Sequence, residues 1–359
     1  MYQEYTSYSG NLLKVLTKQA DTKLQYIIRK YNSDKWAKKL STREHIAVMV
    51  SANLCQSKSL GDITDMIGGT RKFSFPNINK SSLSRINKYR DYHLFEELYQ
   101  NLLRQVRRRV GFSNIRAIDT TTDIVSKVLF SLWPYNRFHG AVRMNLEYDP
   151  HYELPNQIFI THAKTGDTTI AKKLHYKKGI TYLFDAGFRD YKLYSKIIQS
   201  KAFFVVRLHT TNTFTILKTT PVQEQDVISD ETVILGQKHD KRYRMQEKVR
   251  IVTFWNDKHE KYILLGTNRF DLTTKEVREL YRMRWKIEIF FKFIKQNLKL
   301  KRFFGISKNA IKIQIYTALI AYLLAYLIKP KQLQMTVFLR KMRYALFLDC
   351  NQLSIFNTS

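Results

Sequence analysis

The stretch that decides the fold runs from Lys275 to Leu300 and reads KEVRELYRMRWKIEIFFKFIKQNLKL. Leu272-Thr273-Thr274 precedes it as a helix cap, so the pattern predicts one long helix. At about 100° per residue, its apolar side chains share one face: Leu280, Met283, Ile287, Phe290, Phe291, Ile294 and Leu298. A polar stripe within an arc of about 60° borders that face: Tyr281, Arg284, Glu288 and Lys295.

This polar stripe has two readings. Arg284 and Glu288 stand four residues apart, and such a pair stabilises a helix by only a few tenths of a kcal/mol. The helical wheel alone does not decide between a salt-bridge cluster and a functional site. The spacing, a Tyr followed by x2-Arg, x3-Glu and x6-Lys, resembles the full YREK signature of the insertion sequence 4 family of DDE transposases. All four residues match that signature in type and separation.

Two upstream aspartates fit the same resemblance. Asp119 ends an expected strand in Ala-Ile-Asp-Thr-Thr, and Asp185 lies in Leu-Phe-Asp-Ala-Gly-Phe. The second segment resembles the family's motif of an Asp followed by x-Gly-Phe or x-Gly-Tyr at a strand end. The resemblance covers residues 114–328 and is weaker before residue 110. It implies an RNase H-like fold for the catalytic domain.

The resemblance also implies a metal site made of three acids. Hard cations such as Mg²⁺ take oxygen ligands, and two of them roughly 4 Å apart activate a water and stabilise a leaving oxygen. By likeness to the family, Asp119 bridges two Mg²⁺ ions, for which Mn²⁺ can substitute. Asp185 and Glu288 are each expected to hold one ion.

The remaining signature residues are expected to contact DNA phosphates. Arg284 suits bidentate hydrogen bonds to a phosphate, and Lys295 suits a point-charge contact. Tyr281 is expected to support a phosphate or to stack close to it. The resemblance implies a homodimer that binds the terminal inverted repeats of an insertion sequence, cuts them, and joins the freed 3′ hydroxyl to target DNA.

The net charge independently favours a nucleic acid partner. The chain has 61 Lys and Arg against 30 Asp and Glu, a formal charge of +31. Such an excess indicates a polyanionic partner, because basic side chains displace counterions from phosphates. A membrane-surface protein would concentrate its basic residues on one amphipathic helix, whereas here they are spread along the chain. We therefore expect double-stranded DNA as the partner and no membrane association.

Two cysteines and two segments of the chain indicate the cellular compartment of the protein. Cys55 and Cys350 are too few for a disulfide framework and are expected to be thiols in a reducing compartment. Residues 1–16 lack the apolar run of a signal peptide. Ile313–Ile328 has only 16 apolar-rich residues, including a glutamine, and is expected to be a buried core helix. A cytoplasmic, nucleoid-associated prokaryotic protein is the resulting expectation.

The order of patterns predicts an α/β fold with a mixed sheet, helices on both faces and a helical N-terminal domain. Residues 1–112 are expected to be helical and DNA-binding, and 113–330 to form the catalytic domain, with a β-rich insertion at about 209–268. Residues 331–359 are expected to be a basic helical tail. Basic residues indicate DNA contact in the first domain, although a solvated basic face is the alternative: Lys80, Arg85, Lys88, Arg90 and Arg107 to Arg109.

Five neighbouring residues have plainer readings. Asp123 is expected at the surface or in a turn, Asp190 to cap the next helix, and Asp149 to lie in a turn beside a proline. His139 and His162 are expected to be core or surface residues rather than metal ligands.

Three other functions remain open from the sequence. The same fold could serve a nuclease, or a catalytically silent or domesticated DNA-binding descendant. A structural nucleic-acid-binding protein would tolerate neutralisation of Asp119 and Glu288 without consequence for its role.

Overall fold

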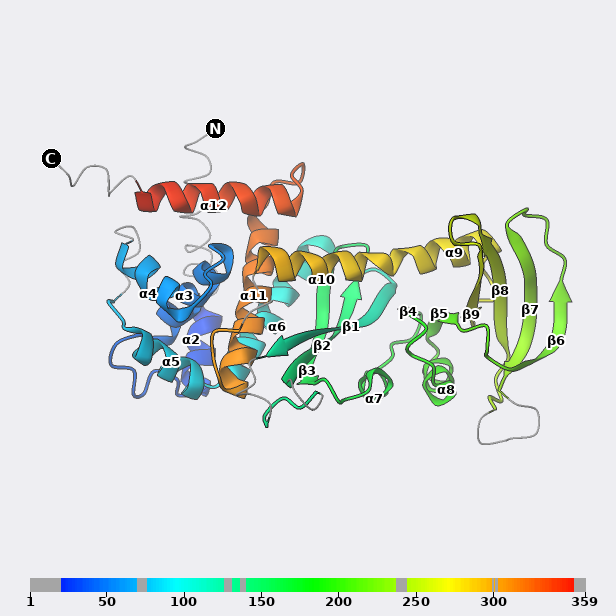
Figure 1. Ribbon diagram of the computed structural model, residues 1–359, viewed down its shortest axis with the longest axis horizontal. Coiled ribbons are helices and arrows are strands. Elements are labelled where there is room, and N and C mark those ends of the chain that lie inside the picture. Colours follow the sequence, from blue (N-terminus) through cyan, green and yellow to red (C-terminus); the bar gives the residue numbers. More distant parts are fainter. Residues whose placement is uncertain are drawn as a thin grey trace. The chain divides into compact units, whose positions relative to one another are not determined.

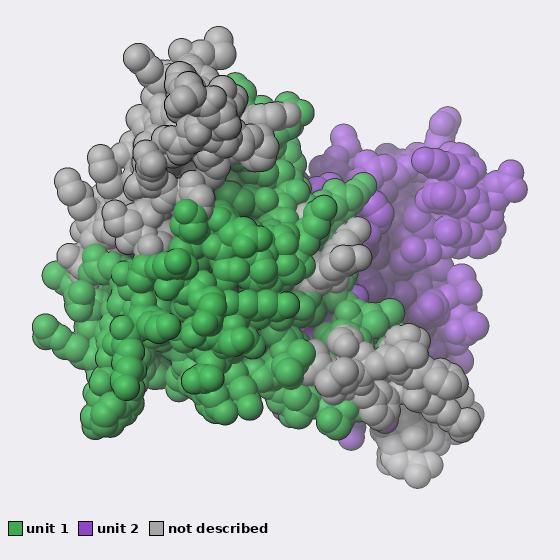
Figure 2. Space-filling view, turned by 60° about the vertical axis from the view of Figure 1, so that its left-hand side comes forward, with its two compact units in different colours: residues 1–111, 123–141, 292–359 green, residues 112–122, 142–291 purple. Residues whose placement is uncertain are grey.

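The computed structural model describes residues 21–69, 76–125, 131–135, 140–236, 244–298, 300 and 303–351. The chain groups into two compact units, which Figure 2 colours green and purple. The helical unit comprises Met1–Gly111, Asp123–Ala141 and Lys292–Ser359, and the sheet unit comprises Phe112–Thr122 and Val142–Phe291. Residues 1–16, His139 and the turn at 238–240, which carried sequence predictions, lie outside the described residues.

The helical unit is built from these elements (Figure 1): α2 (Asp21–Lys30), α3 (Thr42–Leu54), α4 (Leu60–Gly69), α5 (Lys80–Tyr89), α6 (Tyr92–Val110), α11 (Lys308–Ile328) and α12 (Met335–Asn351). A capping box starts α3, because the Ser41 side chain accepts the Glu44 N–H while the Glu44 carboxylate accepts the Ser41 N–H. The helical character expected of residues 1–112 is confirmed for the residues that the structure describes there, which form α2 to α6.

The apolar helix α11 forms the core of the helical unit, where it packs against α3, α5 and α6. It is long and apolar enough to cross a membrane, but 78% of its most apolar window is buried inside the protein. Its polar groups have partners: Asn53 Nδ2 donates to Thr317 Oγ1 at 3.1 Å, and Gln314 Oε1 accepts the Phe304 N–H at 2.9 Å. The predicted buried core helix is confirmed.

Among the described residues of the sheet unit, nine strands form one sheet in the order β3-β2-β1-β4-β5-β9-β8-β7-β6. Their bounds are β1 (Ile115–Val125), β2 (Gly140–Asp149), β3 (Leu154–His162), β4 (Thr181–Phe184), β5 (Phe203–Leu208), β6 (Phe214–Thr220), β7 (Val227–Leu235), β8 (Val249–Asn256) and β9 (Lys261–Thr267). β1, β4 and β5 run parallel to one another, and β2 pairs antiparallel with β3. The pairs β5–β9, β9–β8, β8–β7 and β7–β6 are also antiparallel. The predicted mixed sheet is confirmed, and the β-rich insertion extends this sheet through β9.

α7 (Asp167–Ala171) and α8 (Tyr191–Gln199) connect strands, whereas α9 (Thr274–Met283) and α10 (Trp285–Asn297) follow β9. α8 packs on β5, and α9 packs on β5 and β9. Asp167 occupies the first turn of α7. An aromatic core lies under these helices and includes Phe184, Phe188, Tyr194 and Phe204.

The long helix expected over 275–300 is broken at Arg284, and the prediction of one continuous helix is wrong at that point. The Arg284 N–H donates to Tyr281 O at 3.0 Å, and the Ile287 N–H donates to Arg284 O at 3.1 Å. Both bonds span three residues, as in a 3₁₀ turn, so the chain tightens between α9 and α10. The regular helical wheel therefore describes each half of the stretch but not the joint.

The helical unit and the sheet unit divide the chain differently from the expected domains. α11 groups with the N-terminal helices, whereas the sequence assigns 113–330 to one catalytic domain. The expected domain boundaries stay a prediction.

Candidate active site

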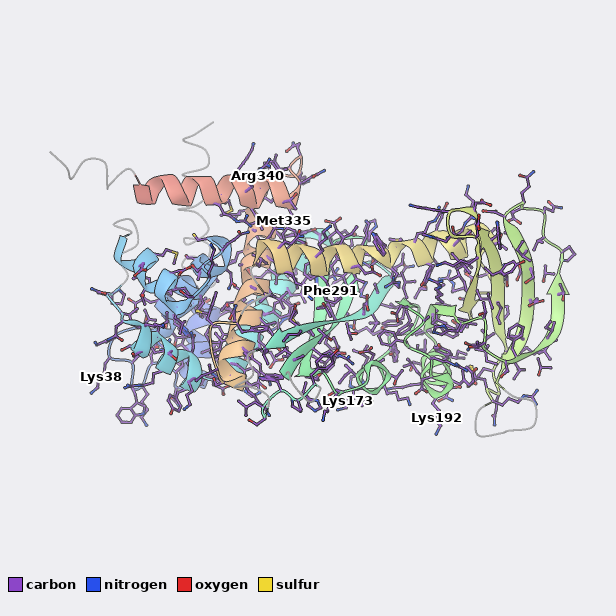
Figure 3. The ribbon with its side chains drawn as sticks, in the orientation of Figure 1. Lys38, Lys173, Lys192, Phe291, Met335 and Arg340 are labelled. Atoms are coloured by element: carbon purple, nitrogen blue, oxygen red, sulfur yellow. The ribbon has the colours of Figure 1, made fainter. Side chains whose placement is uncertain are left out.

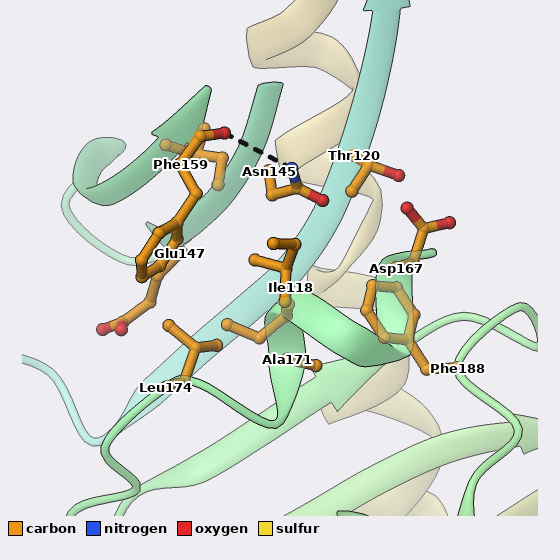
Figure 4. Close-up of a pocket in the computed structure, with 11 residues that line it drawn as sticks. Ile118, Thr120, Asn145, Glu147, Phe159, Asp167, Ala171, Leu174 and Phe188 are labelled. Atoms are coloured by element: carbon orange, nitrogen blue, oxygen red, sulfur yellow. Dashed lines mark hydrogen bonds between the residues drawn. The ribbon is translucent and has the colours of Figure 1, made fainter. Parts of the chain in front are cut away.

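Asp119 lies on strand β1, between β2 and β4, and this strand continues to Val125 rather than ending after Asp119 as expected. Its neighbours Ile118 and Thr120 line a small hollow of about 10 Å³ on one face of the sheet (Figure 4). Because side chains alternate along a strand, Asp119 faces the opposite side. The hollow has room for about one water, so it is not a substrate pocket.

The carboxylate of Asp119 is nearly enclosed. The residue is 8% exposed, and its Oδ1 accepts the Thr120 backbone N–H at 2.7 Å. Its Oδ2 accepts a hydrogen bond from Arg284 Nη1 at 3.1 Å. Asp119 is therefore a buried acid with a cationic partner.

Arg284 joins two of the expected acids. Its Nη1 donates to Asp119, and its Nη2 donates to Glu288 Oε1. The Arg284 and Asp119 side chains are 11% and 12% exposed, whereas Glu288 is 34% exposed. The Arg284 guanidinium also lies 5.8 Å from the centre of the Tyr281 ring. Asp119, Glu288 and Tyr281 thus gather around Arg284.

Asp185 reaches the same part of the sheet through strand register. β1 and β4 run parallel with Ala117 opposite Leu183, so Asp119 and Asp185 each follow a paired residue by two positions. The negative charge of Asp185 contributes to the raised pKa of Asp119, which also indicates that the two carboxylates are near each other.

The motif after β4 has a local physical cause. Asp185 Oδ1 accepts the Gly187 N–H at 2.9 Å, and a Cβ on Gly187 would come within 3.1 Å of that oxygen. Phe188 is 1% exposed and anchors the turn in the aromatic core, where its carbonyl accepts the Tyr194 hydroxyl at 2.9 Å. Glycine and phenylalanine therefore fix where the Asp185 carboxylate points.

The electrostatics of the site favour a bound cation. Burial raises the pKa of Asp119 to about 7, and the negative charges of Asp185 and Glu288 add to that rise. The Thr120 N–H and the Arg284 charge act in the opposite direction. Burial by itself lowers the pKa of Arg284, but its bond to Glu288 and the nearby negative groups leave that pKa raised. The acids are thus short of positive charge even with Arg284 in place.

The donor chemistry of these acids fits a hard divalent cation, because carboxylate oxygens are the ligands that Mg²⁺ and Mn²⁺ prefer. In the described ranges, no three His, Cys, Asp or Glu side chains lie close enough to hold one ion. The Arg284 guanidinium instead supplies the positive charge between Asp119 and Glu288. One guanidinium offsets only part of the negative charge of Asp119, Asp185 and Glu288, and the remainder suits a bound cation.

Lys295 pairs with an acid that the sequence placed at the surface. Its Nζ lies 2.9 Å from Asp123 Oδ1, with side-chain exposures of 19% and 10%. The expectation that Asp123 is a surface or turn residue is wrong, because β1 runs on past it and Lys295 neutralises it. A phosphate contact by Lys295 stays a prediction.

The remaining acid and histidine expectations are met where the structure describes them. Asp190 caps α8 by accepting the Leu193 N–H at 3.1 Å. Asp149 holds a turn by accepting the His151 N–H at 3.0 Å, and His162 is exposed at the end of β3. What the sequence analysis missed is the ion pair of Asp149 with Arg116 at 3.1 Å. An arginine among Ile115, Ala117 and Ile118 at the start of β1 was the available signal.

Two of the basic residues assigned to DNA contact point inward. Arg90 donates to Leu40 O at 2.9 Å and Ser41 O at 3.3 Å, and its side chain is 6% exposed. Arg107 is 3% exposed, and its Nη1 donates to Gly111 O at 3.3 Å. Both residues are structural, whereas Lys80, Arg85 and Lys88 are exposed as expected. Cys55 is an exposed thiol, and the side chain of Cys350 lies outside the described residues.

Known proteins resemble this chain in sequence and in fold. A family model described as a transposase DDE domain matches residues 111–324. A putative transposase, y4zB, of Sinorhizobium fredii is 30% identical over 79% of the chain and 82% of its own length. A probable transposase for insertion sequence element IS5377 of Geobacillus stearothermophilus is 27% identical over 88% of the chain and 83% of its own length.

A third relative and a solved structure agree with these. A putative transposase for insertion sequence element IS4SA of Synechocystis is 28% identical over 77% of the chain and 80% of its own length. The piggyBac transposase in a synaptic complex with hairpin DNA superposes with a TM-score of 0.50, covering 98% of this chain and 82% of that one. At 8% identity this likeness concerns the fold alone, and it agrees with an RNase H-like architecture.

Proposed function

The chain belongs to the DDE transposases, and we propose that it cuts the terminal inverted repeats of an insertion sequence and joins the freed 3′ ends to target DNA. It is a DNA transposase, a polynucleotidyl transferase of a family that uses divalent metal. The proposal concerns the terminal repeats, the cut-and-paste course of the reaction, the identity of the metal and the residues that act.

The observation that carries the proposal is the convergence of Asp119 and Glu288 on Arg284 beside Asp185. These acids come from two neighbouring parallel strands and from the helix α10. A fold brings acids from such distant segments together at a cost in desolvation, as the raised pKa of Asp119 shows. Clusters of this kind are typical of functional sites.

We assign Asp119, Asp185 and Glu288 as the residues that would hold Mg²⁺. When bound, the metal would supply an activated water and stabilise the leaving oxygen. Of the two acids that Arg284 contacts, Glu288 is the more exposed to solvent. Its carboxylate is therefore more accessible to DNA than that of Asp119.

Arg284 and Tyr281 are proposed to hold DNA phosphate near the cut. Arg284 neutralises Asp119 and Glu288 in the metal-free protein, and its planar guanidinium suits bidentate contact with a phosphate. Tyr281 keeps its hydroxyl protonated, because burial raises its pKa above the ordinary value of 10.0. It can therefore donate to a phosphate oxygen. Lys295 is proposed to add charge to the same backbone.

The proposal includes a homodimer that pairs two element ends and a location at the bacterial nucleoid. The net charge of +31 supports DNA as the partner over any neutral surface. The described residues contain one helix apolar enough to span a membrane, and it is mostly buried in the protein.

The test is cleavage in vitro. Purified protein is incubated with Mg²⁺ and labelled DNA that carries the element ends, beside Asp119→Ala and Glu288→Gln variants. We expect metal-dependent cleavage at the element boundary, lost in both variants, while DNA binding persists. Tight binding by the wild-type protein without cleavage would identify a catalytically silent descendant instead.

A further inference from the structure

A basic and aromatic groove lies in the helical unit, along helix α5. One hollow of about 610 Å³ is lined by residues of the segment before α3 and of α5, among them Trp36, Lys38, Lys39, Arg85 and Tyr89. A second hollow of about 220 Å³ is lined by Arg85, Lys88 and Tyr89 together with residues 305–307 and Ala310. The two hollows share Arg85 and Tyr89, so we treat them as one surface and call it the α5 groove.

Two of the aromatic side chains that line the α5 groove are unusually exposed. Trp36 is 83% exposed and Tyr89 is 71% exposed. Each has an ammonium group near its ring: Lys35 Nζ lies 5.4 Å from the Trp36 ring centre, and Lys88 Nζ lies 5.0 Å from that of Tyr89. Neither ring contributes to the core, so packing does not explain why large aromatic residues stand at these positions.

The charge of the α5 groove is almost entirely positive. Lys38, Lys39, Arg85 and Lys88 are exposed, and Figure 3 draws such side chains as sticks and labels Lys38. Asp91 is the one acidic residue among those that line the two hollows, and its carboxylate already accepts the His93 N–H at 2.9 Å. The groove therefore attracts an anionic partner.

The walls of the α5 groove are held in place by Arg90. Its guanidinium donates to the carbonyls of Leu40 and Ser41 and lies 3.7 Å from Asp34. These contacts tie the segment that carries Trp36 to the end of α5, which carries Tyr89. A site held in this way needs little reordering to bind a ligand.

We propose that the α5 groove binds a DNA strand whose bases are unpaired, with Trp36 and Tyr89 stacking on the bases and the cations on the phosphates. Duplex DNA offers phosphates to the cations but keeps its base faces buried in its own stack. Exposed aromatic rings beside a basic track are instead the pattern of single-strand recognition, in which each stacked base adds to the affinity. The inference rests on the proposed function in that DNA is the ligand, and it adds a preference for unpaired ends.

The test compares two DNA probes by fluorescence anisotropy. One is a blunt duplex, and the other is the same duplex with a short unpaired tail. We expect wild-type protein to prefer the tailed probe, and the double variant Trp36→Ala, Tyr89→Ala to lose that preference by roughly 10- to 100-fold. Binding of the blunt duplex should change little. Tyr26→Ala, which removes a 64% exposed tyrosine of α2, is the matched control and should change neither affinity.

Two further measurements guard the interpretation. Trp36→Phe and Tyr89→Phe keep an aromatic ring and should retain most of the tail preference, and equal denaturation midpoints exclude misfolding. Arg85→Gln should weaken both probes alike and reduce the salt dependence of binding by about one phosphate contact. The inference is overturned if the double variant keeps the preference for the tailed probe, or if its affinities for the two probes fall by the same factor.

The assay separates this inference from the proposed function. Glu288→Gln lacks cleavage if the proposed function holds, yet it should prefer the tailed probe as the wild type does. Cleavage by Glu288→Gln with an intact tail preference would contradict the catalytic assignment alone. If the wild-type protein binds tailed and blunt DNA with equal affinity, only the inference about the α5 groove is overturned.

Discussion

The sheet unit contains two clusters of the same composition, one arginine between two carboxylates, and both include a residue of strand β1. Their members are Arg116 with Glu147 and Asp149 in the first cluster, and Arg284 with Asp119 and Glu288 in the second. They differ in how completely their hydrogen bonds are satisfied, and that difference separates an anchor from a reactive site.

The Arg116 cluster is closed. Asp149 is 0% exposed, and beyond Arg116 it accepts the Ser113 hydroxyl at 2.8 Å and the His151 and Tyr152 N–H groups at 3.0 and 3.2 Å. A buried charge with this many donors is stable where it is and offers nothing to a ligand.

The Arg284 cluster is open. Asp119 accepts the Thr120 N–H besides Arg284, Glu288 is one-third exposed, and the pKa of Asp119 is raised to about 7. Equal composition therefore does not imply equal role. A buried acid with few donors and a raised pKa is the more reactive of the two.

The largest expected effect is on catalysis. Glu288→Gln should reduce cleavage by roughly a thousandfold, because metal ligands supply several kcal/mol of transition-state stabilisation. Glu147→Gln makes the same chemical change in the closed cluster and should leave cleavage nearly intact. Gel assays of strand cleavage with both variants measure this. If both variants lose cleavage activity to the same extent, the two clusters do not differ in function.

The next effect is on stability and has the opposite pattern. Asp149→Ala should destabilise the protein by about 3–5 kcal/mol, because it removes one of the two carboxylates that pair with buried Arg116 and leaves several hydrogen-bond donors without their acceptor. Asp271→Ala, which breaks the exposed pair with Arg269, should cost at most about 1 kcal/mol. Urea denaturation gives both values. A small effect of Asp149→Ala would contradict the anchoring role.

The open cluster should also make stability depend on pH in metal-free buffer. The pKa of Asp119 is about 7 in the fold against 3.8 as the ordinary value, so the folded state holds the proton more tightly than the unfolded state. Stability should therefore fall as pH rises from about 4 to about 7, by at most about 4 kcal/mol. Asp119→Asn should flatten this slope. A wild-type profile that rises over the same range would refute the assignment.

The smallest effect concerns Lys295. Lys295→Gln should lower stability by about 1–3 kcal/mol through loss of the Asp123 pair. A double-mutant cycle with Asp123→Asn isolates that interaction. The salt dependence of DNA binding by Lys295→Gln then tests the proposed phosphate contact, since an unchanged slope would show that Lys295 serves Asp123 only.

Local patterns made much of the fold predictable from the sequence. Asp190 caps the helix Tyr191–Gln199 as predicted, because a cap is defined by residues next to it in the chain. The spacing of Tyr281, Arg284 and Glu288 identified residues that the structure brings together. Their roles in catalysis stay predictions.

Features that depend on distant partners were not predictable. The inward turn of Arg90 needs the carbonyls of Leu40 and Ser41, and the burial of Asp123 needs Lys295. The break at Arg284 depends on tertiary contacts that an ideal helical wheel omits. In each case the deciding contact joins segments whose proximity no local pattern encodes.

The pairing of β5 with β9 has a practical consequence. Val205 lies opposite Thr267 and Leu208 opposite Leu264, so the segment between β5 and β9 starts and ends on neighbouring strands of the sheet. This segment is tied to the helices on either side of it: Ser195 of α8 donates to Glu247 at 2.7 Å, and Arg278 of α9 pairs with Asp226. A change within the inserted strands is therefore felt by α9, which leads directly to Arg284 and Glu288. The insertion works as a brace for the helix that carries the third acid.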